Sequence, residues 1–126
     1  MKESIFPPKP KVGGPYSPAV RAGGFVYLSG QIAADPDTGD LTGGDVQAQC
    51  ARVFENHKLV LDACGLTLED VVKANVYLKD MNDFAKMNEA YASFFTGHPP
   101  ARTTVEVARL PRDVSIEIEL IALDRQ

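Results

Sequence analysis

The chain has 126 residues and a mass of 13.7 kDa, which fits a single domain, 1–126, and leaves little room for a second one. Hydrophobic residues make up 44% of the chain and charged residues 24%, so its composition excludes a disordered chain. Lys and Arg total 13 and Asp and Glu total 17, and the resulting net charge of -4 disfavours nucleic-acid binding through a basic surface.

Two further exclusions concern membranes and targeting. No apolar run approaches the roughly 18 residues that a transmembrane helix needs, so we expect no membrane span. Residues 1–15 contain neither the apolar core of a signal peptide nor an Arg-rich amphipathic helix. We therefore expect a cytoplasmic protein.

The first half of the chain predicts two strands and a long helix. A short strand begins at Val20 and turns at two glycines into a mostly apolar strand over 25–29. A helix is predicted over 46–64, since Asp45 is a suitable N-cap and Gly65 a suitable residue to end it. Its apolar residues recur at helical spacing, which predicts one buried face.

The second half predicts three strands and a shorter helix. The β-branched run 71–78 is typical of a central strand, and a helix follows over about 83–95. The last two strands, 103–110 and 114–123, are joined by a short turn, and we expect them to form a hairpin. The order β-β-α-β-α-β-β predicts an α+β fold in which two helices cover one face of a mixed sheet. We expect another copy of the chain to cover the other face.

Histidines and cysteines are too few for a metal centre. His57 and His98 are the only histidines and are badly spaced for zinc, so we expect no metal. His57 lies on the apolar stripe of the first helix, where a structural role is favoured over a catalytic one. Cys50 and Cys64 form no CxxC pair and are expected to be buried thiols. Motifs of phosphate loops and serine hydrolases are also missing.

The strongest candidates for chemistry are an arginine and a glutamate near the C-terminus. Glu117 and Glu119 alternate with apolar residues and therefore project from the same face of their strand. Arg102 begins the preceding strand, directly after two prolines. Arg102 could hold a small carboxylic acid, and a nearby glutamate could position water or move a proton. The alternative is a surface ion pair between arginine and glutamate.

Two other polar residues stand out. Asn88 lies on the apolar stripe of the second helix, four residues after Phe84, where a polar side chain needs a partner. It could contact a ligand or tie two backbone segments together. Tyr16 is an aromatic residue on a loop, which could close a pocket or pack over the edge of the sheet.

Several blocks of the sequence, taken in order, resemble the Rid family of reactive intermediate deaminases, also called YjgF-type proteins. The matching blocks extend over nearly the whole chain: Gly14-Pro15-Tyr16-Ser17-Pro18, Leu28-Ser29-Gly30-Gln31-Ile32, Val76-Tyr77-Leu78-Lys79-Asp80-Met81-Asn82-Asp83-Phe84, Pro100-Ala101-Arg102, Val105-Glu106-Val107-Ala108-Arg109-Leu110-Pro111 and Ile116-Glu117-Ile118-Glu119.

The resemblance implies a chorismate-mutase-like fold and a homotrimer whose sheets form a central barrel, with clefts between neighbouring subunits. It also implies hydrolysis of enamines and imines such as 2-aminoacrylate to 2-keto acids and ammonia, without a cofactor or metal.

The resemblance also implies roles for individual residues. Arg102 matches the arginine that holds the substrate carboxylate, and Glu117 matches the glutamate that positions water or assists proton transfer. Ser29 and the Gly30 backbone N–H lie in the segment that lines the cleft, and Tyr16 matches a tyrosine that closes over the ligand.

Asn88 matches an asparagine near the cleft, and Thr104 stands at a cleft position where many relatives have cysteine. The segment 96–100 is shorter than in close relatives and leads directly into Arg102, so it bears on the shape of the cleft.

Two other functions remain open at this point. A trimer of this kind could bind 2-keto acids or other small carboxylates without turnover, because Arg102 serves binding and catalysis alike. RNA cleavage or inhibition of translation is attributed to some family members, but the acidic composition and the lack of paired catalytic histidines weigh against it.

Overall fold

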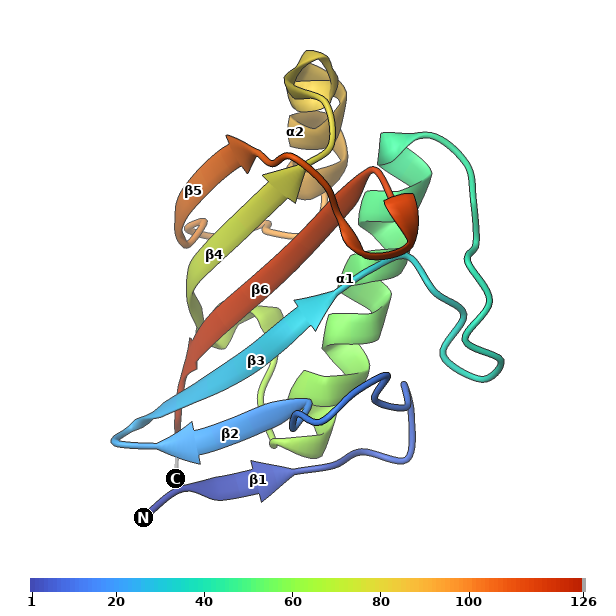
Figure 1. Cartoon of the computed structure of the whole chain (residues 1–126). Coiled ribbons are helices and arrows are strands. Elements are labelled where there is room, and N and C mark those ends of the chain that lie inside the picture. Colours follow the sequence, from blue (N-terminus) through green and yellow to red (C-terminus); the bar gives the residue numbers. More distant parts are fainter. Residues whose placement is uncertain (126) are drawn as a thin grey trace.

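The computed structural model describes residues 1–125, which form one sheet and two α-helices (Figure 1). The main elements are β1 (Glu3–Ile5), β2 (Ala19–Ala22), β3 (Phe25–Gln31), α1 (Val46–Ala63), β4 (Val71–Leu78), α2 (Phe84–Ala92), β5 (Ala101–Glu106) and β6 (Ile116–Leu123). Three short 3-10 turns connect them: η1 (Leu68–Asp70), η2 (Met81–Asp83) and η3 (Pro111–Asp113).

The predicted α+β class and the order of elements from β2 onward are confirmed. The sequence prediction lacked β1, whose three residues pair with β2 at the edge of the sheet. It also extended α2 to Phe95, whereas the helix ends at Ala92. Phe94 and Phe95 continue the chain in tighter turns, with their amides bonded to residues three positions earlier.

The six strands form one mixed sheet in the order β1-β2-β3-β6-β4-β5. β5 runs parallel to β4, and β6 lies between β3 and β4, antiparallel to both. The predicted hairpin between the last two strands is therefore wrong, since β4 separates them. The physical reason is that α2 forms a crossover long enough to bring β5 back parallel to β4.

Helix α1 begins at the predicted residue, Val46, and ends at Ala63, one residue before the predicted end. The Asp45 side chain accepts a hydrogen bond from the Ala48 amide at 3.0 Å, and Gly65 has a φ of +76°, which suits a residue that ends a helix. Cys50 and Cys64 are free thiols buried against the sheet, as predicted. The apolar face of α1 packs onto the sheet, and this packing fixes the position of the helix.

His57 is fully buried between α1 and β6. Its Nε2 lies 2.7 Å from the Ile118 carbonyl oxygen, which can only accept, so Nε2 carries the proton. Burial lowers the pKa of His57 to about 4, although the bond to Ile118 opposes this shift. His57 therefore has the structural role that the sequence predicts.

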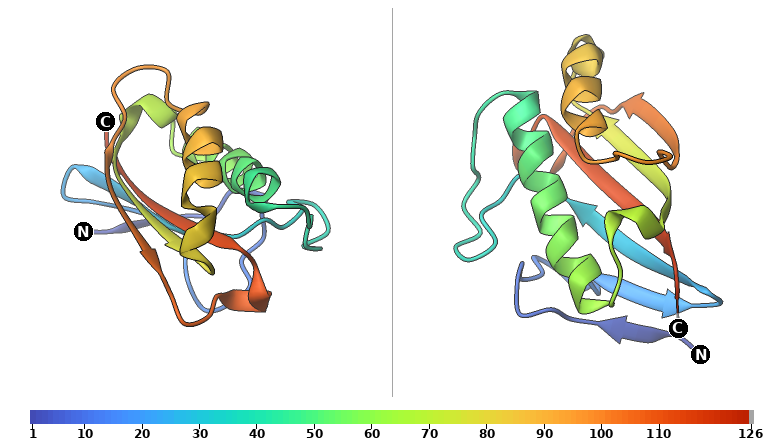
Figure 2. Two further views of the ribbon diagram at one scale, coloured as in Figure 1. Left: turned by 90° about the horizontal axis from the view of Figure 1, so that it is seen from above. Right: turned by 180° about the vertical axis from the view of Figure 1, so that it is seen from behind.

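Both helices cover the same face of the sheet (Figure 2). Alternate strand residues that point away from the helices remain uncovered, and they include large apolar side chains. Phe25, Tyr27, Val105 and Leu123 on this open face are each between 37% and 48% exposed. The site residues are thus distributed between a helix-covered face and an open face.

Candidate functional site

The sheet separates the two residues predicted to carry the chemistry. Arg102 is the register partner of Ala74, which is buried beneath the helices, so Arg102 points to the helix-covered face. Glu117 is the register partner of Tyr77, three residues later in β4 and on the open face. Strand spacing and rise put their Cα atoms about 14 Å apart. Arg102 and Glu117 of one chain therefore cannot both contact the same small ligand.

Aromatic rings of α2 hold the guanidinium of Arg102. Its Cζ lies 4.7 Å from the centre of the Tyr91 ring and 5.6 Å from that of Phe84. No carboxylate within residues 1–125 forms an ion pair with it. A positive charge stacked on rings and free of acidic partners is suited to bind an anionic group.

A hollow of about 410 Å³ opens beside Arg102. The hollow is lined by Asn88, Tyr91, Ala92, Phe95, Pro99, Pro100 and Arg102. The structure thus brings Asn88 next to Arg102, as the sequence-based hypothesis requires. Pro99 and Pro100 form one wall, so the segment that precedes β5 shapes this half of the site.

Three buried oxygens close to Arg102 have no hydrogen-bond partner within the described residues. They are Asn88 Oδ1, the Tyr91 hydroxyl and the Thr104 hydroxyl. Burial raises the pKa of Tyr91 to about 12, with Arg102 opposing the shift, so the hydroxyl keeps its proton. Unsatisfied buried oxygens are rare in protein interiors and often mark sites for water or ligand.

Sequence reasoning placed Tyr91 and Phe84 in the apolar stripe of α2 and assigned them no role at the site. Both face Arg102 in the structure. The available signal was their spacing around Asn88, because residues three and four positions apart share a helix face with it.

Glu117 lies on the open face against the backbone of Gly30. A Cβ atom built at Gly30 would overlap the Glu117 carboxylate and would lie 3.0 Å from its Cδ. The absence of a side chain at position 30 therefore lets the carboxylate fold over the strand. β3 bulges at this point, between Leu28 and Gln31, which interrupts its register with β6.

A second hollow, of about 630 Å³, contains the remaining predicted residues. Its lining comprises Gly13, Tyr16, Ser29, Gly30, Ile32, Ala34, Gly39, Pro111, Arg112, Glu117 and Glu119. The Ser29 hydroxyl donates to the Ser17 carbonyl at 2.7 Å, which fixes the loop that carries Tyr16. Tyr16 is 48% exposed at the rim, so its ring is accessible on this side of the sheet.

A hydrogen-bonded group next to Glu117 was not foreseen. Glu119 accepts a short hydrogen bond from the Tyr77 hydroxyl and a 3.2 Å bond from Asn75 Nδ2. Burial raises the pKa of Glu117, and the neighbouring Glu119 raises it further. Strand alternation predicted the shared face of Glu117 and Glu119, but the partners on β4 depended on a register that the sequence does not reveal.

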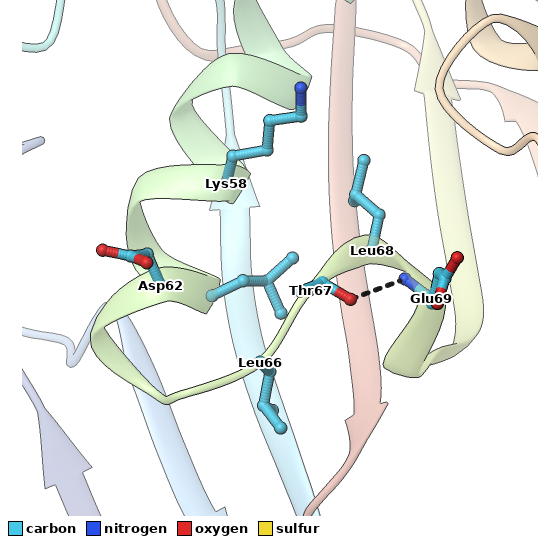
Figure 3. Close-up of a pocket in the computed structure, with 7 residues that line it drawn as sticks. Lys58, Asp62, Leu66, Thr67, Leu68 and Glu69 are labelled. Carbon is cyan, nitrogen blue, oxygen red and sulfur yellow. Dashed lines mark hydrogen bonds between the residues drawn. The ribbon is translucent and has the colours of Figure 1, made fainter.

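A third hollow, of about 550 Å³, lies between α1 and η1 and contains none of the predicted residues. Lys58 and Asp62 extend from successive turns of α1, with Leu66 and Leu68 on the facing segment (Figure 3). Thr67 accepts the Glu69 amide at 3.3 Å, a local cap that stabilises η1. Unlike the hollow beside Arg102, this one is lined by no buried side-chain oxygen that lacks a hydrogen-bond partner within residues 1–125.

Residues 1–125 contain neither a cluster of metal ligands nor a membrane-spanning helix. No three side chains of His, Cys, Asp or Glu lie together as metal ligands would. No helix in that part of the chain is both long and apolar enough to cross a membrane.

Comparison with known proteins identifies the class. The family model described as Endoribonuclease L-PSP matches residues 7–124. A RutC family protein of Pyrococcus horikoshii is 57% identical over 123 residues, which cover 97% of this chain and 98% of its own. The 2-iminobutanoate/2-iminopropanoate deaminase of Salmonella typhimurium is 50% identical over 119 residues, 92% of each chain.

Solved structures agree with these matches. The Escherichia coli YjgF gene product has a TM-score of 0.91 at 45% identity, over 98% of this chain and 99% of its own. Escherichia coli TdcF, solved with bound serine, has a TM-score of 0.90 at 42% identity, over 96% of this chain and 98% of its own.

One mixed sheet with two helices on one face, and a polar hollow on each side of it, defines a small α+β protein of the YjgF type. The chain belongs to the Endoribonuclease L-PSP family, which includes the RutC, YjgF and Rid proteins. The resemblance to the Rid family is therefore confirmed.

Proposed function

We propose that the protein hydrolyses small 2-imino acids to 2-keto acids and ammonia, in clefts that form between neighbouring copies of the chain. The observation that carries the proposal is the unpaired guanidinium of Arg102, stacked on rings beside a hollow with unsatisfied oxygens. Relatives at about half identity carry the name of this deaminase, and TdcF binds serine, an amino acid of the expected size.

The separation of the two half-sites supports an assembly. Arg102 lies on β5, the edge strand, while Glu117 faces the opposite side of the same sheet. A cleft that contains both groups therefore requires Arg102 from one copy and Glu117 from another. The exposed apolar residues of the open face supply a surface for such contacts. We propose the homotrimer that the family resemblance implies.

The first role in the proposed reaction is to hold the substrate. The guanidinium of Arg102 binds the carboxylate in two parallel hydrogen bonds and thereby fixes the position of C2. An enamine such as 2-aminoacrylate first converts to its imine tautomer by moving a proton from nitrogen to C3. The C2 of the imine is electrophilic, so orientation and electrostatics supply much of the catalysis.

Glu117 carries the proton transfers. Glu117 first gives its proton to the imine nitrogen, and as a carboxylate it then takes a proton from water while the water oxygen bonds to C2, so that the C=N double bond becomes a single bond to an amino group. Glu117 returns this proton to the amino nitrogen of the carbinolamine. As the C–N bond breaks and ammonia leaves, the hydroxyl oxygen forms the C=O bond and its proton passes to Glu117, which is again protonated. Imine and water are thus converted to keto acid and ammonia. A raised pKa of Glu117, caused first by burial, favours this exchange near neutral pH.

The direct test couples a threonine or serine dehydratase to the purified protein and follows imine decay and keto-acid release. The wild type should accelerate both. Arg102→Ala should lower kcat/KM at least ~100-fold, or about 2.7 kcal/mol, because both binding and orientation are lost. Arg125→Ala is the matched control, since it removes an exposed arginine that pairs with Asp70 instead. No acceleration by the assembled wild type would refute the proposal for these substrates.

Mixing two inactive variants tests where the site lies. Arg102→Ala and Glu117→Ala chains, unfolded together and refolded, should regain activity, because about one quarter of the clefts in random trimers receive both intact residues. Each variant refolded alone should stay inactive. If the mixture stays inactive although mixed trimers form, the cleft does not combine Arg102 and Glu117 from different copies.

The same proteins also test the two alternative functions, which are carboxylate binding without turnover and RNA cleavage. Tight binding of a 2-keto acid without turnover would favour a carboxylate sensor. Cleavage of RNA that is lost in a surface variant would favour the activity that the family model's description names. The net charge of -4 does not favour the second outcome.

A further inference from the structure

We propose that Glu119 is a positioning residue: Tyr77 and Asn75 fix its carboxylate, and its negative charge holds the proton on Glu117. The inference deepens the proposed deaminase function, on which its catalytic meaning rests. The coupling between the two glutamates, however, is a property of this chain that can be measured without any turnover.

β6 brings Glu117 and Glu119 to the same face of the sheet. Glu117 and Glu119 are two residues apart in the strand, so both point to the open face, with Cα atoms about 7 Å apart. Both side chains are half-buried and line the same hollow. At this separation and degree of burial, the charge of one carboxylate acts on the other.

Two side chains of β4 anchor Glu119. Its Oε1 accepts from the Tyr77 hydroxyl and from Asn75 Nδ2, two donors from the neighbouring strand β4. These two hydrogen bonds hold the Glu119 carboxylate in place against β4. The hydrogen bond to Glu119 is the main cause that raises the pKa of Tyr77, to about 12, with burial and the charges of both glutamates adding to it. Tyr77 therefore stays protonated and continues to donate.

Glu117 differs from Glu119 in its hydrogen bonding. Glu117 is packed against Gly30 and receives no side-chain donor within the described residues. Burial raises the pKa of Glu117, and Glu119 is the one charged side chain that adds to the effect. Glu117 therefore has a raised pKa beside a carboxylate that β4 holds in place, an arrangement that suits an acid next to an anion.

Several other titratable or charged groups lie near Glu117. Those that line its hollow or occupy the facing strand are Tyr16, Lys73, Tyr77, Arg112 and Glu119. Lys73 donates to Thr103 at 2.9 Å, and Arg112 donates to the Gly39 carbonyl at 2.8 Å. β3 contributes no ionisable side chain at its bulge. Among these groups, Glu119 is the charged side chain that raises the pKa of Glu117.

The functional consequence concerns the departure of ammonia. A Glu117 that keeps its proton to a higher pH can still donate it to the nitrogen of the carbinolamine near neutrality. Without the fixed charge of Glu119, Glu117 would ionise at a lower pH and be a poorer donor. The anchored glutamate thus sets the upper pH at which the proposed reaction proceeds efficiently.

The test follows the side-chain carboxyl carbons of ¹³C-labelled glutamate by NMR as pH is raised, in the assembled full-length protein. Glu119→Gln should lower the titration midpoint of Glu117 by about 0.5 pH unit, because one nearby negative charge is removed. The same variant should lower the midpoint of Tyr77. Glu55→Gln makes the same change in net charge at an exposed position on α1 and should move neither midpoint. An unchanged Glu117 midpoint in folded Glu119→Gln would overturn the inference.

A pH profile of kcat/KM links the coupling to turnover. In Glu119→Gln the limb that falls at high pH should move downward together with the NMR midpoint. Tyr77→Phe, which keeps the ring, tests the anchoring and should move the limb in the same direction. If the midpoints shift but the wild type shows no deaminase activity, the proposed function fails while the coupling stands. If the protein is active and the limb does not move, the role of Glu119 in catalysis is refuted.

Discussion

The glycine beside Glu117 offers a probe of the site that leaves the fold intact. In Gly30→Ala the new Cβ would lie 3.0 Å from the Glu117 Cδ and overlap its carboxylate. Carbon pairs prefer about 3.5–4.0 Å, so the carboxyl group must retreat by about 0.5–1 Å. The side chain can swing away at little energetic cost, and Gly30 does not need a left-handed backbone. The free energy of unfolding should therefore change by less than about 1 kcal/mol.

The Gly30→Ala substitution should lower activity far more than it changes stability. A displacement of that size at a proton-transfer group should lower kcat/KM about 10- to 100-fold, or by roughly 1.4–2.7 kcal/mol. The dehydratase-coupled assay measures this, and urea denaturation confirms the fold. Glu55→Gln serves as the control, since it changes an exposed side chain of α1 that lines neither hollow. A folded Gly30→Ala protein with wild-type kcat/KM would show that the position of the Glu117 carboxylate does not matter.

Three other variants should change stability. Glu117→Gln should stabilise the fold at pH 7, because the raised pKa of Glu117 makes ionisation of this side chain costlier in the folded state than in the unfolded state. The gain in the free energy of unfolding should be less than about 1 kcal/mol, since Glu117 is partly solvated. Urea denaturation should show this gain at pH 7 and not at pH 4. The lowered pKa of His57 means that the unfolded chain binds its proton first, so stability should fall by roughly 3 kcal/mol between about pH 6.5 and pH 4. Wild type and His57→Gln should differ in that slope, whereas His98→Gln, at an exposed loop position, should retain it. Asp45→Ala removes the cap of α1 and should cost about 1 kcal/mol in thermal unfolding, with no effect on kcat/KM; an unchanged melting temperature would contradict the capping role.

Local patterns in the sequence predicted what depends on local physics. The capping residues Asp45 and Gly65 defined α1, and strand alternation put Glu117 and Glu119 on one face. Pairing of strands depends on contacts distant in sequence, and there the prediction failed for the last two strands. The pattern of strand, helix and strand from β4 to β5 is the signal that should have indicated parallel pairing.

The sequence predicted which residues form the candidate site but not how these residues are placed relative to one another in the sheet. Strand alternation and position selected Arg102 and Glu117, and the family resemblance then supported that choice. The predicted hairpin would have placed the two residues on neighbouring strands, whereas the observed order inserts β4 between them. Tyr77 was missed because its bond to Glu119 follows from the register of β4 and β6, which no single strand specifies. Interactions across strands are therefore the part that required the three-dimensional structure.

The position of Arg102 on an edge strand also affects how the molecule responds to heat. β5 is paired only with β4, whereas β6, which carries Glu117, is paired on both sides. Local opening of β5 therefore costs less free energy than unfolding of the whole domain, and its amide hydrogens should exchange sooner than those of β6. Warming would first loosen the strand that holds the carboxylate-binding arginine, while the core beneath α1 remains closed. A bound carboxylate would tighten the same strand and raise the temperature at which it opens.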